Sequence, residues 1–186
     1  MTSQKILCIC LIVVMVISFA SCGVSHEEFV SAVEKYKVFD KPTTMGDAEI
    51  ETVADFIEVM ESFDGENENY MTFINASWST ENLTEEDKFI QKLQEETDFV
   101  YDEDKYYGRL HVNVEVGSKK DYSTKENITY YFLFSLKDEE ITAEATAISP
   151  IYDEFDYEDF KLGERAVQTN MDVIFMLASI MQETYK

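Results

Sequence analysis

Two acidic, aromatic stretches hold the residues of this chain that are best suited to chemistry. They are "YDEDKYYGR" at 101–109 and "YDEFDYEDF" at 152–160, and each begins with Tyr-Asp-Glu. Carboxylate oxygens are the ligands that hard cations such as Ca²⁺ prefer, and tyrosine rings stack on sugars and peptides. The candidate residues for binding a ligand or a cation are Asp102, Asp104, Tyr152, Asp153 and Asp156. Solvated acidic loops whose rings enter the core would give the same pattern, and we favour this plainer interpretation.

The spacing of the candidate ligands does not identify a metal. Neither stretch has the spacing of an EF-hand loop, and "DGENEN" at 64–69 lacks the glycine that such a loop needs at its sixth position. His26 and His111 lie 85 positions apart in the sequence with no available cysteine, so they offer no ligand spacing for zinc. We expect no cofactor, and Ca²⁺ is the alternative.

A polar sheet face is the second candidate site, and it includes His111. Apolar residues alternate with polar ones from residue 109 to residue 116, which is typical of a strand with one buried face. The opposite face would carry Arg109, His111, Asn113 and Glu115, and the next hairpin would add Thr142, Glu144 and Thr146. Such a face can form a ligand groove. An ordinary solvated face of an antiparallel sheet has the same sequence pattern, and we favour that interpretation.

Catalytic motifs are not recognisable in the sequence. It contains no Gly-x-Ser-x-Gly elbow and no glycine-rich phosphate loop. With 38 Asp and Glu residues, some carboxylate pair will lie at hydrolytic separation in any fold, so acid pairs identify no glycosidase. We therefore expect a non-catalytic binding or interaction module, with a hydrolase that uses a carboxylate pair as the alternative.

The charge of the chain excludes one class of partner. It carries 38 Asp and Glu against 15 Lys and Arg, a formal net charge of −23, and its longest run of cations is the pair Lys119-Lys120. Nucleic-acid binding needs clustered cations for the phosphates, so it is excluded. The hydrophobic content of 45% and aromatic content of 13% are too high for a disordered acidic chain.

The amino terminus has the layout of an export signal. Lys5 is followed by an apolar stretch from Ile6 to Ala20, which is shorter than the about 20 residues that a transmembrane helix needs. All three cysteines, Cys8, Cys10 and Cys22, lie in this region. The exported domain is therefore not held together by disulfides.

The junction "FASCG" at 19–23 resembles the lipobox of bacterial membrane lipoproteins, in which two small residues precede the cysteine that is lipidated. Phe19 stands where an aliphatic residue is usual. The resemblance implies a signal peptide at 1–21, lipidation of Cys22, and a single extracytoplasmic domain at 22–186 held on the cell membrane by its lipid. Its ligand would be an unknown envelope protein, peptide or glycan. The alternative is a secretory signal cleaved after Ala20, with Ser18 and Ala20 as the small residues.

The elements that would position these residues predict an α+β fold. Capping residues and apolar spacing indicate helices that begin at Ser25, near Gly46 and near Thr84, and alternation indicates strands at 110–116, 128–136 and 140–148, with a weaker strand at 70–78. The strands would form an antiparallel meander sheet, packed against the N-terminal helices and a long apolar C-terminal helix.

The C-terminal helix is expected to span residues 163–185 and to be apolar on nearly all sides. Its Val167, Ile174, Leu177 and Ile180 are therefore predicted to be core residues. An oligomer interface along this helix is the alternative.

Overall fold

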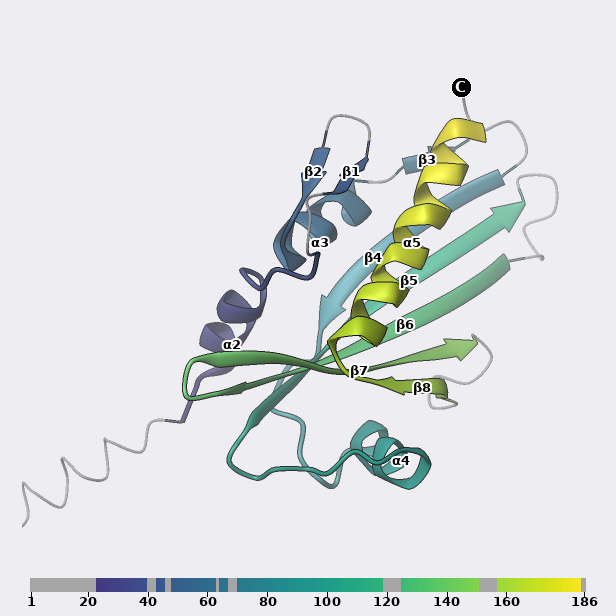
Figure 1. Ribbon diagram of the computed structural model, residues 1–186. Helices are drawn as coiled ribbons and strands as arrows, with labels where there is room; N and C mark the ends of the chain where they lie inside the picture. Colours follow the sequence, from purple (N-terminus) through teal and green to yellow (C-terminus); the bar gives the residue numbers. More distant parts are fainter. Residues whose placement is uncertain are drawn as a thin grey trace, which may run out of the picture.

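The computed structural model describes residues 23–39, 43–45, 48–62, 64–66, 70–118, 125–150 and 157–184. The predicted α+β fold is confirmed, because an antiparallel sheet of six strands packs against helices (Figure 1). The helices are α2 (His26–Val33), α3 (Val53–Glu61), α4 (Lys88–Glu96) and α5 (Glu164–Thr184). The sheet contains β3 (Asp64–Glu66), β4 (Tyr70–Trp78), β5 (Tyr106–Ser118), β6 (Lys125–Lys137), β7 (Glu140–Pro150) and β8 (Glu158–Leu162). Two short strands, β1 (Thr43–Met45) and β2 (Ala48–Ile50), pair with each other.

The sheet is a meander, with its strands in the order β3-β4-β5-β6-β7-β8. The predicted hairpin between β6 and β7 is present, and its turn consists of Asp138 and Glu139, with φ values of 50° and 67°. Positive φ at both central residues is what a tight turn needs to match the twist of the two strands. Because β5, β6 and β7 are long and paired over most of their length, they form the platform on which the helices pack.

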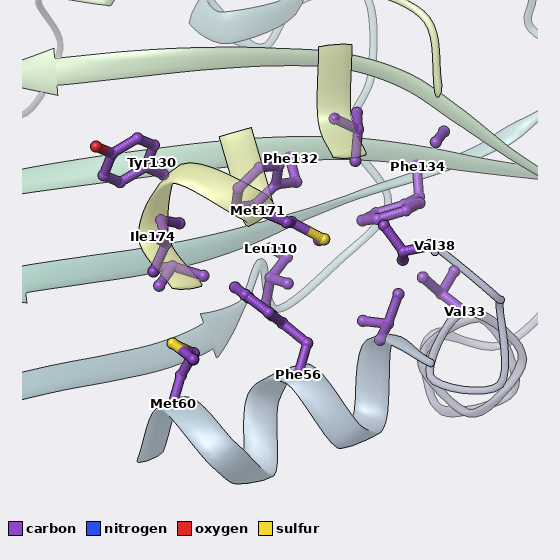
Figure 2. Close-up of a cluster of buried hydrophobic side chains, with 14 of the residues drawn as sticks. Val33, Val38, Phe56, Met60, Leu110, Tyr130, Phe132, Phe134, Met171 and Ile174 are labelled. Atoms are coloured by element: carbon purple, nitrogen blue, oxygen red, sulfur yellow. The ribbon is translucent and has the colours of Figure 1, made fainter. Parts of the chain in front are cut away.

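One face of the sheet is covered by α2, α3 and α5, and it carries the larger core. Figure 2 shows Phe56 and Met60 of α3 and Met171 and Ile174 of α5 reaching towards the sheet. From the sheet, Leu110 of β5 and the aromatic side chains of β6 complete this cluster: Tyr130, Phe132 and Phe134. The apolar residues of β5 therefore point inward on this face, as their alternation predicts.

The C-terminal helix is long but not apolar on all sides, so that part of the prediction is wrong. Val167 and Ile174 are fully buried, as expected, whereas Leu177 is 37% exposed and Met176 is 57% exposed. The side chain of Ile180 lies outside the described residues. A helix laid on one face of a sheet buries only one stripe, and α5 exposes Glu164, Arg165, Thr169 and Asp172 on its other side.

The second face of the sheet is covered in part by α4, which packs Phe89, Ile90 and Leu93 against it. This is the helix expected to begin near Thr84, but its N-cap is Asp87. The sheet contributes aromatic and aliphatic side chains to this second core: Tyr107, Tyr131 and Leu133. Both faces of the sheet are therefore packed.

The second predicted helix begins later than expected. Residues 48–50 are strand β2, and α3 starts at Val53 behind a capping box made by Thr52 and Asp55. The carboxylate of Asp55 accepts a hydrogen bond from the backbone N–H of Thr52, and the hydroxyl of Thr52 accepts one from the backbone N–H of Asp55. Two backbone donors at the start of the helix are thereby satisfied. The pairing of Ala48–Ile50 with β1 overrides the helical spacing of this segment.

The first helix, α2, begins at the predicted capping box of Ser25 and Glu28 and packs closely on β5. Its Phe29 is fully buried and lies over Gly108. A Cβ atom at position 108 would lie 2.1 Å from Cε1 of Phe29, so only glycine allows this approach.

Candidate functional site

Three clefts adjoin the turn that joins α4 to β5. One of about 560 Å³ lies along α4, one of about 670 Å³ lies at the turn, and one of about 710 Å³ extends to the β6–β7 turn. The first two clefts share Glu85, and the last two share Glu103 and Lys105. The stretch "YDEDKYYGR" therefore lines two adjoining clefts.

The lining of these clefts is strongly acidic. Its carboxylates are Glu85, Glu86, Glu95, Asp102, Glu103, Asp104 and Asp138, and its cations are Lys105 and Lys137. Both lysines are already paired within the protein. The clefts therefore favour a ligand that presents cationic or hydrogen-bond-donating groups.

Asp102 and Asp104, two of the predicted candidates, lie together and share one lysine. Nζ of Lys137 is 3.1 Å from Asp102 Oδ2 and 3.5 Å from Asp104 Oδ2, and the backbone N–H of Asp104 donates to Asp102 Oδ1 at 3.0 Å. That N–H first, and then Lys137, hold the pKa of Asp102 below its usual range. A cation at this position would have to displace Lys137. Within the described residues, no group of three or more His, Cys, Asp or Glu side chains is placed to hold a metal ion.

A β-bulge in β7 brings Glu144 to the same end of the sheet. Its Oε1 accepts from Ser135 Oγ at 2.5 Å and from Lys105 Nζ at 2.6 Å. Thr146 does not join it, because Thr146 is fully buried under α5, where its Oγ1 accepts from Asn170 Nδ2 at 2.9 Å. The expectation that Glu144 and Thr146 line one face is therefore wrong. The register shift at the bulge breaks the alternation on which that expectation depended.

An apolar and aromatic edge borders the acidic surface. Val100 is 81% exposed, and the ring of Tyr101 stacks on Tyr107 with a centroid distance of 5.0 Å. Tyr107 is fully buried, and its hydroxyl accepts from the backbone N–H of Asp102 at 3.2 Å. Burial raises the pKa of Tyr107 to about 12. As the plainer interpretation predicts, the acidic residues of this stretch flank a ring that enters the core.

Arg109 and His111 are packed rather than solvated, which corrects the expectation of an ordinary wet face at these positions. The guanidinium carbon of Arg109 lies 4.9 Å from the ring centre of Phe89, 5.3 Å from that of Tyr131 and 5.7 Å from that of Tyr157. Its side chain is only 11% exposed. The sequence alone does not reveal this arrangement, because Phe89 and Tyr157 are brought to β5 by α4 and by the segment before β8.

His111 accepts a hydrogen bond from Arg109, whose Nε lies 2.9 Å from His111 Nε2. This contact assigns the ring proton to Nδ1. Burial first, and then the nearby charge of Arg109, lower the pKa of His111 to about 4. His111 is therefore neutral near pH 7, and its role in this cluster is to hold Arg109 in place.

Beyond this cluster the same face of the sheet stays polar. Asn75 and Ser77 of β4 are exposed, and Asn113 Oδ1 accepts from Thr129 Oγ1 at 3.5 Å. Asn113 and Glu115 are half-buried. Among the described residues, this polar face is solvated along β4, at Asn75 and Ser77.

Other predicted positions lie outside the described residues: Cys22, Tyr152, Asp153 and Asp156. Sequence reasoning also missed Lys105 and Lys137 as partners of the acidic residues, since a lone lysine beside a turn carries no recognisable signal. None of the helices in the described ranges combines the length and the apolar character needed to cross a bilayer. Comparison with known proteins finds no matching family model, no matching curated protein and no matching solved structure.

Proposed function

We propose that this protein is a bacterial lipoprotein, anchored in the membrane through Cys22, whose extracytoplasmic domain binds a component of the cell envelope without catalysis. The observation that carries the proposal is the junction "FASCG" directly before a folded domain. Helix α2 begins at the capping box of Ser25 and is packed on β5, so the domain starts three residues after Cys22. A lipid on Cys22 would leave no free thiol on the exported chain.

Two of the clefts, the one along α4 and the one at the α4–β5 turn, support binding as the role of the domain. They join acidic side chains to the exposed apolar surface of Val100 and to the ring of Tyr101. Such a surface suits an envelope protein, peptide or glycan with cationic groups. A hydrolase that uses a carboxylate pair would be favoured by two raised carboxyl pKa values in one cleft. The pKa of Asp102, which lines one of these clefts, is instead lowered.

The anchor is tested by Cys22→Ala in a bacterial host, with detergent phase partition and membrane fractionation. The wild type should enter the detergent phase, because two acyl chains hold a protein firmly in a bilayer. Cys22→Ala should enter the aqueous phase or remain as an unprocessed precursor. The matched control is Cys8→Ala with Cys10→Ala, which changes only the leader and should leave partition unchanged. A soluble wild type that begins at Ser21 would overturn the anchor.

The binding surface is tested by photocrosslinking in whole cells. A photoreactive phenylalanine at Val100 should give a discrete adduct, because this side chain is 81% exposed at the rim of the cleft. The control is the same group at Asp172, an exposed position on α5. Charge reversal at Glu85 and Glu86 should abolish the adduct from position 100. Equal adducts from both positions, or an adduct that survives charge reversal, would contradict this assignment of the surface.

A further inference from the structure

The two residues that follow Cys22 lie at one end of the sheet. Gly23 and Val24 line the cleft of about 710 Å³ together with Tyr106 at the start of β5 and Asp138 in the β6–β7 turn. Figure 1 shows α2 and the β6–β7 turn at the same end of the sheet, with the last turns of α5 towards the other. Consecutive Cα atoms are about 3.8 Å apart, so a lipid on residue 22 is attached beside this end.

Helix α2 leaves no flexible linker between residue 22 and the domain. His26 Nδ1 lies 2.9 Å from the Tyr106 hydroxyl, and Phe29 stacks on Tyr106 with a centroid distance of 4.9 Å. The buried ring of Phe29 occupies the space that a side chain at Gly108 would need. Contacts to β5 thus begin at the first turn of the helix, and α2 cannot serve as a flexible spacer.

We propose that the end of the sheet formed by the β6–β7 turn and the start of β5 contacts the phospholipid headgroup layer; this inference rests on the anchor at Cys22. The headgroup layer of one leaflet is roughly 5–8 Å thick, so residues that share a cleft with Gly23 lie at its surface. The exposed Asn75, paired with Asn113, lies about 23 Å further along the sheet than Tyr106, at about 3.3 Å per residue. With the start of β5 at the headgroups, the solvated position Asn75 is therefore placed farther from the bilayer than Tyr106.

The charges at this end identify the kind of lipid surface that it fits. Glu103, Asp104 and Asp138 line the cleft, and its Lys137 is paired with Asp102 and Asp104. Carboxylates are repelled by anionic headgroups at low salt. The contact therefore suits zwitterionic headgroups, and the lipid anchor rather than a basic face holds the domain there.

Fluorescence quenching on vesicles tests this orientation. Residues 23–186 contain no cysteine, so Asp138→Cys and Asn75→Cys each add a single labelling site at an exposed position. The lipidated full protein carrying one label is reconstituted in phosphatidylcholine vesicles, some of whose headgroups bear a nitroxide quencher. The label at 138 should be quenched at least twofold more strongly than the label at 75.

Flotation of the vesicles distinguishes a failure of the proposed orientation from a failure of the lipid anchor. Protein that floats with the vesicles but is quenched equally at both positions, or more at 75, overturns the orientation and leaves the anchor intact. Protein that does not float overturns the anchor and the orientation together. Circular dichroism of both labelled variants checks that neither substitution unfolds the domain.

Discussion

At the scale of single residues, the most unusual environment belongs to Arg109 and His111. A guanidinium against three aromatic rings gains cation–π attraction, and its hydrogen bond to His111 requires that the imidazole stay neutral. The salt bridge from Arg109 to Asp87, at 3.7 Å, links this cluster to the N-cap of α4. One histidine therefore couples the protonation state of the protein to the attachment of a helix.

Acidification should destabilise the protein through His111. Its pKa is about 4 in the folded state against 6.5 ordinarily, so between these values the unfolded chain binds a proton that the folded one does not. The stability that depends on His111 should fall as pH drops from 6.5 towards 4 and level off below that. Between pH 7.0 and pH 4.5 the wild type should lose about 2 to 3 kcal/mol more free energy of unfolding than His111→Gln, measured by urea denaturation. Equal losses in the two proteins would show that His111 titrates normally.

At the scale of elements, α5 holds the larger core together while exposing part of its apolar surface. Val167, Met171, Ile174 and Ala178 are fully buried against the sheet. Met176 and Leu177 lie on the solvent side of the same helix. The two kinds of position are interleaved in the sequence, so their apolar character alone does not separate them.

The substitutions Ile174→Ala and Leu177→Ala should therefore lower the free energy of unfolding by very different amounts. Truncation of the fully buried Ile174 should lower the free energy of unfolding by about 2 to 5 kcal/mol, because it leaves a cavity. Truncation of Leu177, which is 37% exposed, should cost less than about 1 kcal/mol. Urea denaturation at two protein concentrations measures both. If Leu177→Ala instead turns an oligomer into a folded monomer in light scattering, α5 is an interface between chains.

At the scale of the whole molecule, the dominant property is the formal net charge of −23. The clefts concentrate this charge around the α4–β5 turn, where both lining lysines are already paired. Repulsion between such carboxylates acts over the Debye length, about 10 Å at 0.1 M salt. Self-repulsion of this kind opposes the compact state.

The melting temperature should therefore rise by several degrees between 10 mM and 150 mM NaCl, as measured by circular dichroism. Screening weakens the repulsion between carboxylates in the folded state. The matched control replaces the exposed Glu85, Glu86 and Glu95 with Gln, which should reduce the response to salt. A flat response in the wild type would mean that its acidic residues are locally compensated.

The sequence by itself determined the local features of the fold, those that depend only on residues close together in the chain. The helix start at Ser25 and the alternation in β5 are local patterns, and each appears in the structure as predicted. The large excess of acidic over basic residues likewise follows from composition alone. Local patterns suffice here because helix and strand periods are set by backbone geometry within a few residues.

Only the tertiary structure decided which distant side chains meet. Packing of α4 on the second face buried Arg109, and the β7 bulge turned Glu144 towards Lys105. The β6–β7 turn placed Lys137 beside Asp102, which the sequence suggests as a ligand for a bound cation. These contacts join segments far apart along the chain. Periodicity says which residues face inward, but the pairing of strands and the docking of helices decide what each of them touches.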